Sequence, residues 1–379
     1  MNPAVKKLEP IIMEIFQHLH NHPEISWQEY GTTSYVAGLL ERHGYRTRRF
    51  EDCTGVVGEI GSGRPVVALR ADMDALWQEV DGRFQANHSC GHDAHMTMVL
   101  GTILLFQRMG YYPPGTFRVI FQPAEEKGTG ALRMVEKQVI RDADYLYGVH
   151  LRPVQELKNG TAAPAILHGA ARFITGEIIG SEAHAARPHL GINTIEVGAS
   201  FVQELSRIRL DPMVPHSVKM TRFTAGSESG NIIPGRARFS LDLRAQTNRI
   251  MDELTSRVHH IAKSLERLHR VEIRLTDTAY TAAAERNEEA ERLMARAIRD
   301  ALGPERLAEP IVTPGGEDFH FYPLKNPRLK ATMLGLGCGL RPGLHHPQMT
   351  FDRGALLNGI DILSRAVQLT FARHEEGHP

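Results

Sequence analysis

The chain has 379 residues, of which 42% are hydrophobic and 23% charged, so it can bury a sizeable core and should not be mostly disordered. Lys plus Arg and Asp plus Glu each number 44, a balance that leaves no global charge to attract nucleic acid or an anionic membrane. The three cysteines, Cys53, Cys90 and Cys338, argue against a disulfide framework and fit a reducing compartment.

The N-terminal segment has the features of neither a signal peptide nor a membrane span. MNPAVKKLEP is followed by a helical pattern, without an apolar run and a small-residue cleavage site. No stretch reaches the roughly 18 apolar residues that a span needs. We therefore expect a cytoplasmic protein. Because a single core rarely grows past about 250–300 residues, we also expect two domains.

Helical and strand patterns alternate along the first part of the chain. Apolar spacing predicts helices over residues 5–20, 31–43 and 96–108. Short apolar runs predict buried strands in the segments VVGEIG (56–61), PVVALRAD (65–72) and TFRVIFQPAEE (116–126). This alternation predicts an α/β domain with a mostly parallel sheet.

Polar residues follow these apolar runs. Asp72 and Asp74, Glu125 and Glu126, and His150 each come directly after one. Since ligands bind outside the carboxyl ends of strands in such sheets, we expect a site at this edge.

The pattern changes near residue 170. Alternating segments predict half-exposed strands at 171–180, 218–226 and 237–245, and amphipathic spacing predicts helices at 194–207 and 248–267. After about residue 282 we expect a helix at 288–302, a loop at 310–318, a strand at 330–337 and a helix at 354–373. The predicted organisation is an α/β domain of residues 1–170 and 282–379, interrupted by an α+β domain of residues 171–281.

The run Cys90-Gly91-His92-Asp93 is a candidate metal-binding motif. Its thiol and imidazole can converge on one ion if the backbone bends, which Gly91 permits. Asp93 could accept a hydrogen bond that fixes the tautomer of His92. On these four residues alone, a buried free cysteine beside a turn is an equally good interpretation.

The pair Glu125-Glu126 could divide two roles, one carboxylate binding metal and the other acting as a base. Metal hydrolases need both, because the attacking water must be bound and also deprotonated. By itself, the pair is explained more simply as a charged loop start. Taken singly, His150, His345 and His184 are likewise explained more simply as satisfied polar groups.

Together these motifs resemble the M20 metallopeptidase-type amidohydrolases, in particular the branch of aminoacylases, hippurate hydrolases and plant auxin-conjugate amidohydrolases. The resemblance implies a zinc-exopeptidase-type α/β catalytic domain with an inserted α+β lid or dimerisation domain. The matching segments keep the family's order over nearly the whole chain: HPEIS (22–26), LRADMDAL (69–76), CGHDAH (90–95), FQPAEE (121–126), HAARP (184–188), GNIIP (230–234), GEDF (316–319) and LH (344–345).

The resemblance also implies roles for individual residues. Glu125 matches the general base, and His184 matches a histidine that reaches the partner subunit's site in dimeric relatives. Asn231 and Arg244 match substrate-binding positions. Two divalent ions (Zn, Mn, Co or Ni) are implied, with a bridging cysteine and four further ligands: Cys90, His92, Glu126, His150 and His345. His346 stands where the family has a small residue, which leaves a choice between His345 and His346 that Leu344 decides in favour of His345.

The implied activity is hydrolysis of the amide bond of N-acyl, and in particular N-acetyl, amino acids. The expected partners are this small substrate and a second copy bound through the inserted domain, without nucleic acid or membrane. A dipeptidase or aminopeptidase with the same metal chemistry is the first alternative. A non-catalytic metal-binding relative is the second, although it would not need a spare base. A His-rich storage protein is disfavoured because the 20 histidines are scattered. Arg187, Arg222 or Arg244 could bind a substrate carboxylate.

Overall fold

The computed structural model describes residues 2–376 and divides into two compact units. Unit 1 contains the described residues up to Leu167, the segment Glu285–Val312 and the described residues from Asp318 onward. Unit 2 contains His168–Ala284 and Thr313–Glu317. Each unit has a hydrophobic core of its own.

A seven-stranded sheet forms the centre of unit 1, in the order β1-β2-β6-β3-β7-β17-β8. Strands β6, β3, β7 and β17 are parallel to one another, whereas β1, β2 and β8 are antiparallel to their neighbours. The prediction of a mostly parallel sheet was therefore wrong for the outer strands, and the sheet is mixed. The strands are β1 (Arg46–Arg49), β2 (Val56–Gly61), β3 (Val66–Asp72), β6 (Thr116–Gln122), β7 (Tyr145–Pro153), β8 (Ala162–Ala163) and β17 (Lys330–Leu340).

The burial of these strands explains the two kinds of pairing. Every residue of β3, β6 and β7 is buried, as expected for strands covered on both faces. Strand β1 is instead largely exposed and carries three arginines, which suits an edge that faces water. The outer strands could not be recognised as antiparallel from apolar runs alone, because direction leaves no periodic signal.

A short hairpin follows β3, with strands β4 (Leu76–Val80) and β5 (Arg83–Asn87). Its turn is Asp81-Gly82, and both residues have positive φ, 50° and 80°. An Asp-Gly pair of this kind matches the twist of the two strands it joins. This hairpin was not predicted from the sequence. Two further short strands of the chain are β9 (Ile166–His168) and β16 (Ile311–Thr313).

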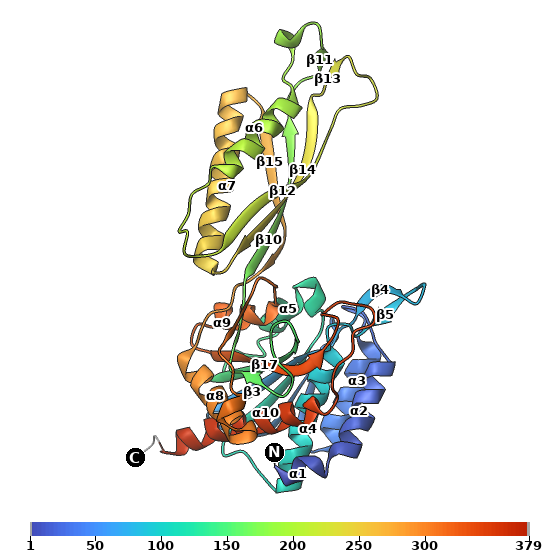
Figure 1. Cartoon of the computed structure of the whole chain (residues 1–379), viewed down its shortest axis with the longest axis vertical. Helices are drawn as coiled ribbons and strands as arrows, with labels where there is room; N and C mark the ends of the chain where they lie inside the picture. The colour runs from blue at the N-terminus through green and yellow to red at the C-terminus, as the bar shows by residue number, and fades with distance from the viewer. Residues whose placement is uncertain (1, 377–379) are drawn as a thin grey trace. The chain divides into compact units, whose positions relative to one another are not determined.

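Helices cover the sheet of unit 1 on both sides. Figure 1 shows α5 and α9 on one side of the sheet and α4 and α10 on the other. Within the described residues, no helix combines the length and the apolar character needed to cross a membrane. The helices are α1 (Pro3–Lys6), α2 (Glu9–Asn21), α3 (Tyr30–Arg42), α4 (His92–Met109), α5 (Gly130–Glu136), α8 (Glu288–Leu302), α9 (Phe321–Lys325) and α10 (Ala355–Glu376), with 3₁₀ turns η1 (Glu125–Lys127), η3 (Pro304–Arg306) and η4 (Asp318–His320).

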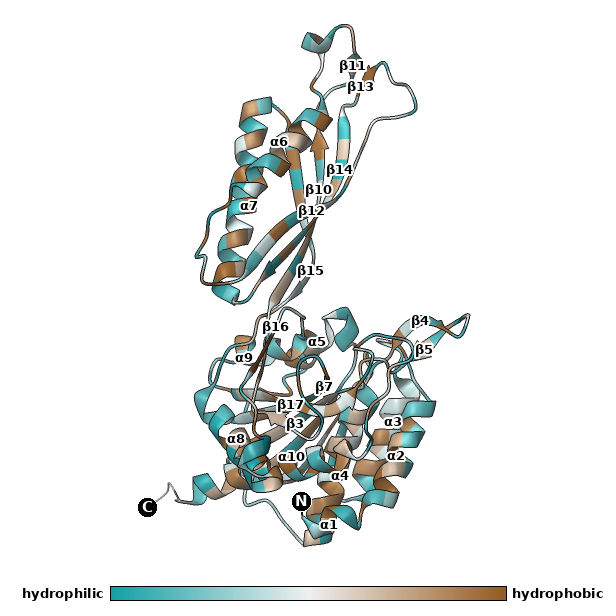
Figure 2. Cartoon of the chain, in the orientation of Figure 1, coloured by the Kyte–Doolittle hydropathy of each residue, from teal (hydrophilic) through white to brown (hydrophobic). Residues whose placement is uncertain are grey.

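Helix α4 is buried from His92 to Phe106 and is coloured as largely hydrophobic in Figure 2. Its predicted start at Met96 was four residues late. Three of its first four residues, His92, Asp93 and His95, are buried but polar, so apolar spacing does not detect this turn. Gly91, with φ of 91°, precedes the helix and makes the bend that the motif predicted.

Unit 2 is built on an antiparallel sheet in the order β12-β14-β10-β15, against which α6 and α7 pack. Strand β15 was not predicted, because most of its residues are exposed and their polarity hides the alternation. Helix α7 alternates polar and apolar colouring in Figure 2, as expected for a helix with one buried face. The elements are β10 (Ala170–Ile179), β11 (Ala183–His184), η2 (Pro188–Leu190), α6 (Thr194–Ser206), β12 (His216–Ala225), β13 (Ile232–Ile233), β14 (Arg236–Ala245), α7 (Asn248–His269) and β15 (Glu272–Thr281).

Candidate metal centre

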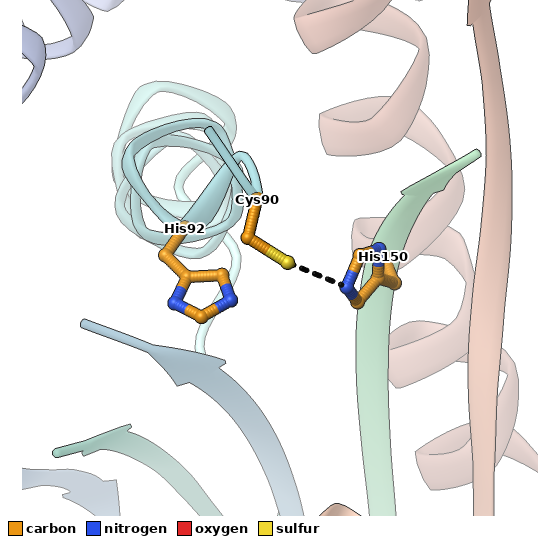
Figure 3. Close-up of side chains that lie close together, drawn as sticks. All are labelled: Cys90, His92 and His150. Atoms are coloured by element: carbon orange, nitrogen blue, oxygen red, sulfur yellow. Dashed lines mark hydrogen bonds between the residues drawn. The ribbon is translucent and has the colours of Figure 1, made fainter. Parts of the chain in front are cut away.

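The start of α4 and the strand β7 bring a thiol and two imidazoles together inside unit 1. Figure 3 shows the Cys90 thiol directed at the imidazole of His150, with the ring of His92 beside Cys90. Cys90 lies two residues before His92, the first residue of α4, and His150 lies in β7. Cys90 Sγ lies 3.6 Å from Nε2 of His150. All three side chains are buried, and their potential ligand atoms lie within 4.8 Å of one another. This grouping favours a ligand set over an isolated buried cysteine.

Backbone carbonyls orient both imidazoles. Nδ1 of His92 lies 2.8 Å from the carbonyl oxygen of Asp74, and Nδ1 of His150 lies 2.7 Å from that of Leu151. A carbonyl only accepts, so Nδ1 of each ring carries a proton, and in the neutral form of the ring Nε2 keeps its lone pair. Each ring is thus oriented by Nδ1 and could bind a cation through Nε2, as in most protein ligands to metals.

The turn after β6 carries the two adjacent glutamates. Ala124 adopts a left-handed conformation with φ of 52°, and the amides of Glu125 and Glu126 donate to the carboxylate of Asp74 at 3.1 and 3.0 Å. Nε2 of His92 then lies 3.8 Å from Glu125 Oε2 and 3.9 Å from Glu126 Oε1. The turn therefore presents both carboxylates to the same imidazole, with only 10% of each side chain exposed.

The loop after β17 supplies one of its two neighbouring histidines. His345 Nε2 lies 3.5 Å from Glu126 Oε1 and forms a ligand-type group with Glu126 and Cys90. His346 instead uses Nδ1 to accept the amide of Gln348 at 3.1 Å. The structure thus brings His345, and not His346, to the cluster.

Two atoms at the centre of this cluster are buried and lack a hydrogen-bond partner among the described residues. They are Nε2 of His92 and Oε1 of Glu126. Buried polar atoms are rarely left unpaired, so such a pair calls for a ligand. Thiolate, imidazole and carboxylate donors suit zinc, manganese, cobalt or nickel, and the residues present therefore fit divalent cations.

The protonation of these groups without a cation agrees with that fit. Burial raises the pKa of Cys90 well above its usual value and raises the pKa of Glu126 to about 7. Burial lowers the pKa of His150 well below its usual range. For His92, burial opposes the charged form, but Asp72 and Cys90 outweigh it and raise the pKa. Without a cation, Cys90, Glu126 and His92 thus hold protons at positions that a cation would otherwise occupy, whereas His150 stays neutral.

Two buried carboxylates, Asp72 and Asp74, hydrogen-bond to the groups around the candidate ligands. Asp74 also accepts the hydroxyl of Ser26 at 2.6 Å, in addition to the two turn amides. Asp72 Oδ1 lies 2.7 Å from Nδ1 of His95, whose Nε2 accepts the amide of Leu151 at 3.0 Å. Both nitrogens of His95 are therefore engaged, which makes it a support rather than a ligand. In the sequence, the Asp72-Met73-Asp74 segment at the end of an apolar run was the feature that could have indicated these supporting carboxylates.

The predicted role of Asp93 was wrong. Its Oδ2 lies 2.6 Å from Nδ1 of His20, and its Oδ1 accepts the amide of Ala94 at 2.8 Å. The acceptor beside His92 is Asp74. Asp93 lies in the first turn of α4, so its side chain points to a different neighbour than that of His92.

The other predicted site residues belong to unit 2. His184 lies in β11, is exposed, and accepts the amide of Ala186 at Nδ1. Asn231 directly precedes β13, which pairs with β11, and its carbonyl accepts the amide of Ala185. Arg244, in β14, forms two hydrogen bonds to Asp242 at 2.7 and 3.1 Å. His184 and Asn231 are thus neighbours, and Arg244 is engaged by a carboxylate of its own strand.

Comparison with known proteins places this geometry in context. Peptidase family M20/M25/M40 matches residues 68–369. An N-acyl-L-amino acid amidohydrolase of Geobacillus stearothermophilus is 33% identical over 67% of this chain and 72% of that protein. The IAA-amino acid hydrolase ILR1-like 2 of Arabidopsis thaliana is 31% identical over 82% of this chain and 74% of that protein. The crystal structure of the Bacillus subtilis YXEP protein, a dinuclear metal binding peptidase from the M20 family, has a TM-score of 0.82 at 24% identity, covering 97% of this chain and 99% of that chain.

Proposed function

The chain belongs to peptidase family M20/M25/M40 and is a hydrolase of linear amides, and we propose that it cleaves N-acyl amino acids, with N-acetyl amino acids as the first substrates to test. Family membership confirms the resemblance drawn from the motifs and the α/β fold class. The products would be a carboxylate and a free amino acid.

One observation carries this proposal. Glu125 and Glu126 both lie near Nε2 of His92, at 3.8 and 3.9 Å, yet of the two only Glu126 also groups with Cys90 and His345. A binding site without catalysis would not need the additional carboxylate. We therefore assign Cys90, His92, Glu126, His150 and His345 as ligands of two divalent ions, and Glu125 as the general base.

The division of labour follows from this assignment. Divalent ions held by these ligands would supply a water of lowered pKa and would polarise the scissile carbonyl. Glu125 accepts the proton as the water oxygen adds to the acyl carbon, and it delivers that proton to the amine nitrogen as the carbon–nitrogen bond breaks. The amide of Asp318 donates to Glu125 Oε1 at 3.4 Å and holds the carboxylate in the turn. In this proposal His184 donates to the developing oxyanion.

The proposal extends to unit 2, for which the sequence predicted a lid or dimerisation role. Asn231 and Arg244 would contact the substrate, and His184 would act in its own chain or in the site of a second copy. Strand β12 is an edge of its sheet and pairs on one side only with β14, so it offers a surface for a second copy. Sedimentation analysis of the full chain decides the oligomeric state.

The substitution Glu125→Gln tests the base. It keeps the size of the side chain but removes the proton acceptor, so we expect turnover of an N-acetyl amino acid to fall by about 100- to 10,000-fold. Zinc content, measured by elemental analysis, should stay at the wild-type value. Near-native turnover by this variant would contradict the assignment of Glu125.

A parallel assay tests the substrate class. N-acetyl amino acids and free dipeptides are offered to the same zinc-loaded enzyme, because the two candidate activities differ in whether an acyl group or a free amino group precedes the scissile bond. We expect the N-acetyl compounds to be cleaved with the higher kcat/KM. Preference for dipeptides would instead support the peptidase alternative.

A further inference from the structure

The loop that carries His345 is closed by backbone hydrogen bonds at its two ends, but the side chain of His345 is largely exposed. Arg341 and Thr350 exchange two backbone hydrogen bonds, of 2.9 and 2.8 Å, and so close the loop between them. His345 itself has φ of 64°, a left-handed conformation that residues with a side chain rarely adopt. Its imidazole is 55% exposed, so packing does not fix its direction. The direction must come from the backbone.

Both backbone groups of His345 are held by the segment that runs from β4 to Cys90. Its amide donates to the carbonyl of Ser89 at 2.7 Å. Its carbonyl accepts from Nε2 of Gln78 at 3.0 Å. Asn87 adds a second attachment, since its Nδ2 donates to the carbonyl of Pro347 at 3.0 Å and to Oε1 of Gln78 at 2.8 Å. We call Gln78 and Asn87 the hairpin clamp.

The hairpin that carries the clamp is fixed at its tip and at both ends. Its two-residue Asp81-Gly82 turn leaves little freedom at the tip. At one end, Ala75 donates its amide to the carbonyl of Glu24 at 2.8 Å and follows the supporting Asp74 directly. At the other end, β5 leads through two residues to Cys90. Figure 1 labels this hairpin β4 and β5, beside α3.

We propose that the hairpin clamp positions His345 as a metal ligand. Gln78 holds the His345 carbonyl and Asn87 holds the Pro347 carbonyl, so the left-handed turn persists and Nε2 of His345 stays directed at Glu126. The proposal rests on the metal centre proposed above. Neither Gln78 nor Asn87 touches the cluster with its own side chain, so both act through the loop.

A loop held in this way should bind its cation more tightly, because the ligand is directed before the cation arrives. Groups that orient a ligand in this manner typically change metal affinity by about 10- to 100-fold when they are removed. The loss should fall on the ion that His345 contacts and spare the other. The sites of two ions on one protein can be separated by competition with a chelator of known zinc affinity.

The register of the hairpin offers a matched control. Gln78 faces Gln85 across the two strands, and the structure gives Gln85 no side-chain bond to the loop within the described residues. The variants Gln78→Met and Gln85→Met replace the same side chain by one of equal length without donors. We expect Gln78→Met to lower the affinity for one of two zinc ions by about 10- to 100-fold. Gln85→Met should match the wild type.

Two further measurements separate positioning from general damage. Thermal unfolding after removal of zinc should give the same midpoint for Gln78→Met and Gln85→Met. In a His345→Ala background, Gln78→Met should cause no additional loss of zinc affinity, because the ligand through which it acts is gone. Asn87→Leu removes the hydrogen bonds from Asn87 to Pro347 and Gln78, and it should also lower the affinity for only one of the two zinc ions.

Contrary results would identify which claim fails. A wild-type protein that binds no zinc would overturn the metal centre and with it the clamp. If the wild type binds two zinc ions and Gln78→Met binds both with unchanged affinity, the positioning role of the hairpin clamp is wrong, but the metal centre is not. A loss of affinity that persists at full size in the His345→Ala background would also overturn it.

Discussion

Arg70 lies fully enclosed in unit 1 beneath the glutamate turn. Its guanidinium donates to Asp72 at 2.6 Å, to Gln122 at 2.9 Å and to Asp318 at 2.9 Å. A buried charge is tolerated only when it is paired and hydrogen-bonded, and these three acceptors meet that condition. The network joins the end of β3, the end of β6 and the turn η4, which lie next to the proposed metal ligands.

This buried charge affects a neighbouring histidine. Burial, with the nearby Arg70 charge, lowers the pKa of His320 to about 3, against an ordinary value of 6.5. The folded state therefore releases this proton more readily than the unfolded state does. The stability associated with neutral His320 is complete above about pH 6.5 and is lost as the pH falls toward 3, by about 1.4 kcal/mol for each unit.

Urea unfolding of the zinc-free protein between pH 7 and pH 4 measures this effect. The variant His320→Gln removes the titrating group, so its free energy of unfolding should fall less steeply with acidification than that of the wild type. Equal slopes for the two proteins would show that His320 binds its proton equally in the folded and unfolded states.

Residue identity made part of the centre predictable. Cys90 and His92 were proposed as ligands from their residue types and spacing, and the glutamate pair also from its place after an apolar run. Contacts between distant segments leave no such signal. The carboxylate of Asp74 accepts the amide of Glu125, 51 residues further along the chain. Asp93 hydrogen-bonds to His20, 73 residues away, and not to His92. Spacing in the sequence cannot reveal either pairing.

At the scale of elements, the turn between β6 and α5 is the most crowded part of the centre. A Cβ atom on Gly130 would lie 1.7 Å from the carbonyl oxygen of Pro123, a backbone atom that cannot rotate away. The whole turn carrying Glu125 and Glu126 depends on this close approach, because Gly130 donates its amide to the carbonyl of Ala124.

Gly130→Ala should therefore displace the turn. We expect the free energy of unfolding to fall by about 1–3 kcal/mol, as in overpacked cores, together with zinc affinity. Gly38→Ala in α3 is the control. Its Cβ would meet only one arginine nitrogen at 4.0 Å, so stability should rise by about 0.5–1 kcal/mol. Denaturant unfolding and zinc titration of both variants check the contrast, and an unaffected Gly130→Ala would contradict it.

Elements with a strong apolar period were predictable and the others were not. The helix predicted at 288–302 coincides with α8, which has one apolar and one charged face. The hairpin of β4 and β5 was missed because Trp77 and Phe84 are exposed and blur its alternation. Strand β15 was missed because few of its residues are buried, so its sequence shows no apolar alternation.

At the scale of the whole molecule, the two cores are separate clusters of buried side chains. Phe201 is completely buried in the core of unit 2 and packs edge-to-face on Phe239, with ring centroids 5.3 Å apart. Phe201→Ala should lower the stability of unit 2 by about 3–5 kcal/mol. Because no ligand of the proposed centre belongs to unit 2, zinc affinity should be unchanged.

Hydrogen exchange distinguishes the outcomes. Amides of β10 and β14 should exchange faster in Phe201→Ala, whereas those of β3 and β7 should keep their protection. Equal loss of protection in both units would show that they unfold as one. The length of the chain and the change of pattern near residue 170 predicted an inserted domain, but its lid or dimerisation role stays a prediction.

The order of the strands has a consequence for synthesis on the ribosome. Strand β17 pairs with β7 in the middle of the sheet of unit 1, yet it is translated only after the whole of the insertion. Until then β7 has an unpaired edge, and such an edge can pair with a strand of another nascent chain. The insertion, continuous in sequence from His168 to Ala284, can complete its own sheet during this interval. His345 emerges later still, so in the proposed centre the ion that His345 would contact could be bound only after β17 has been made.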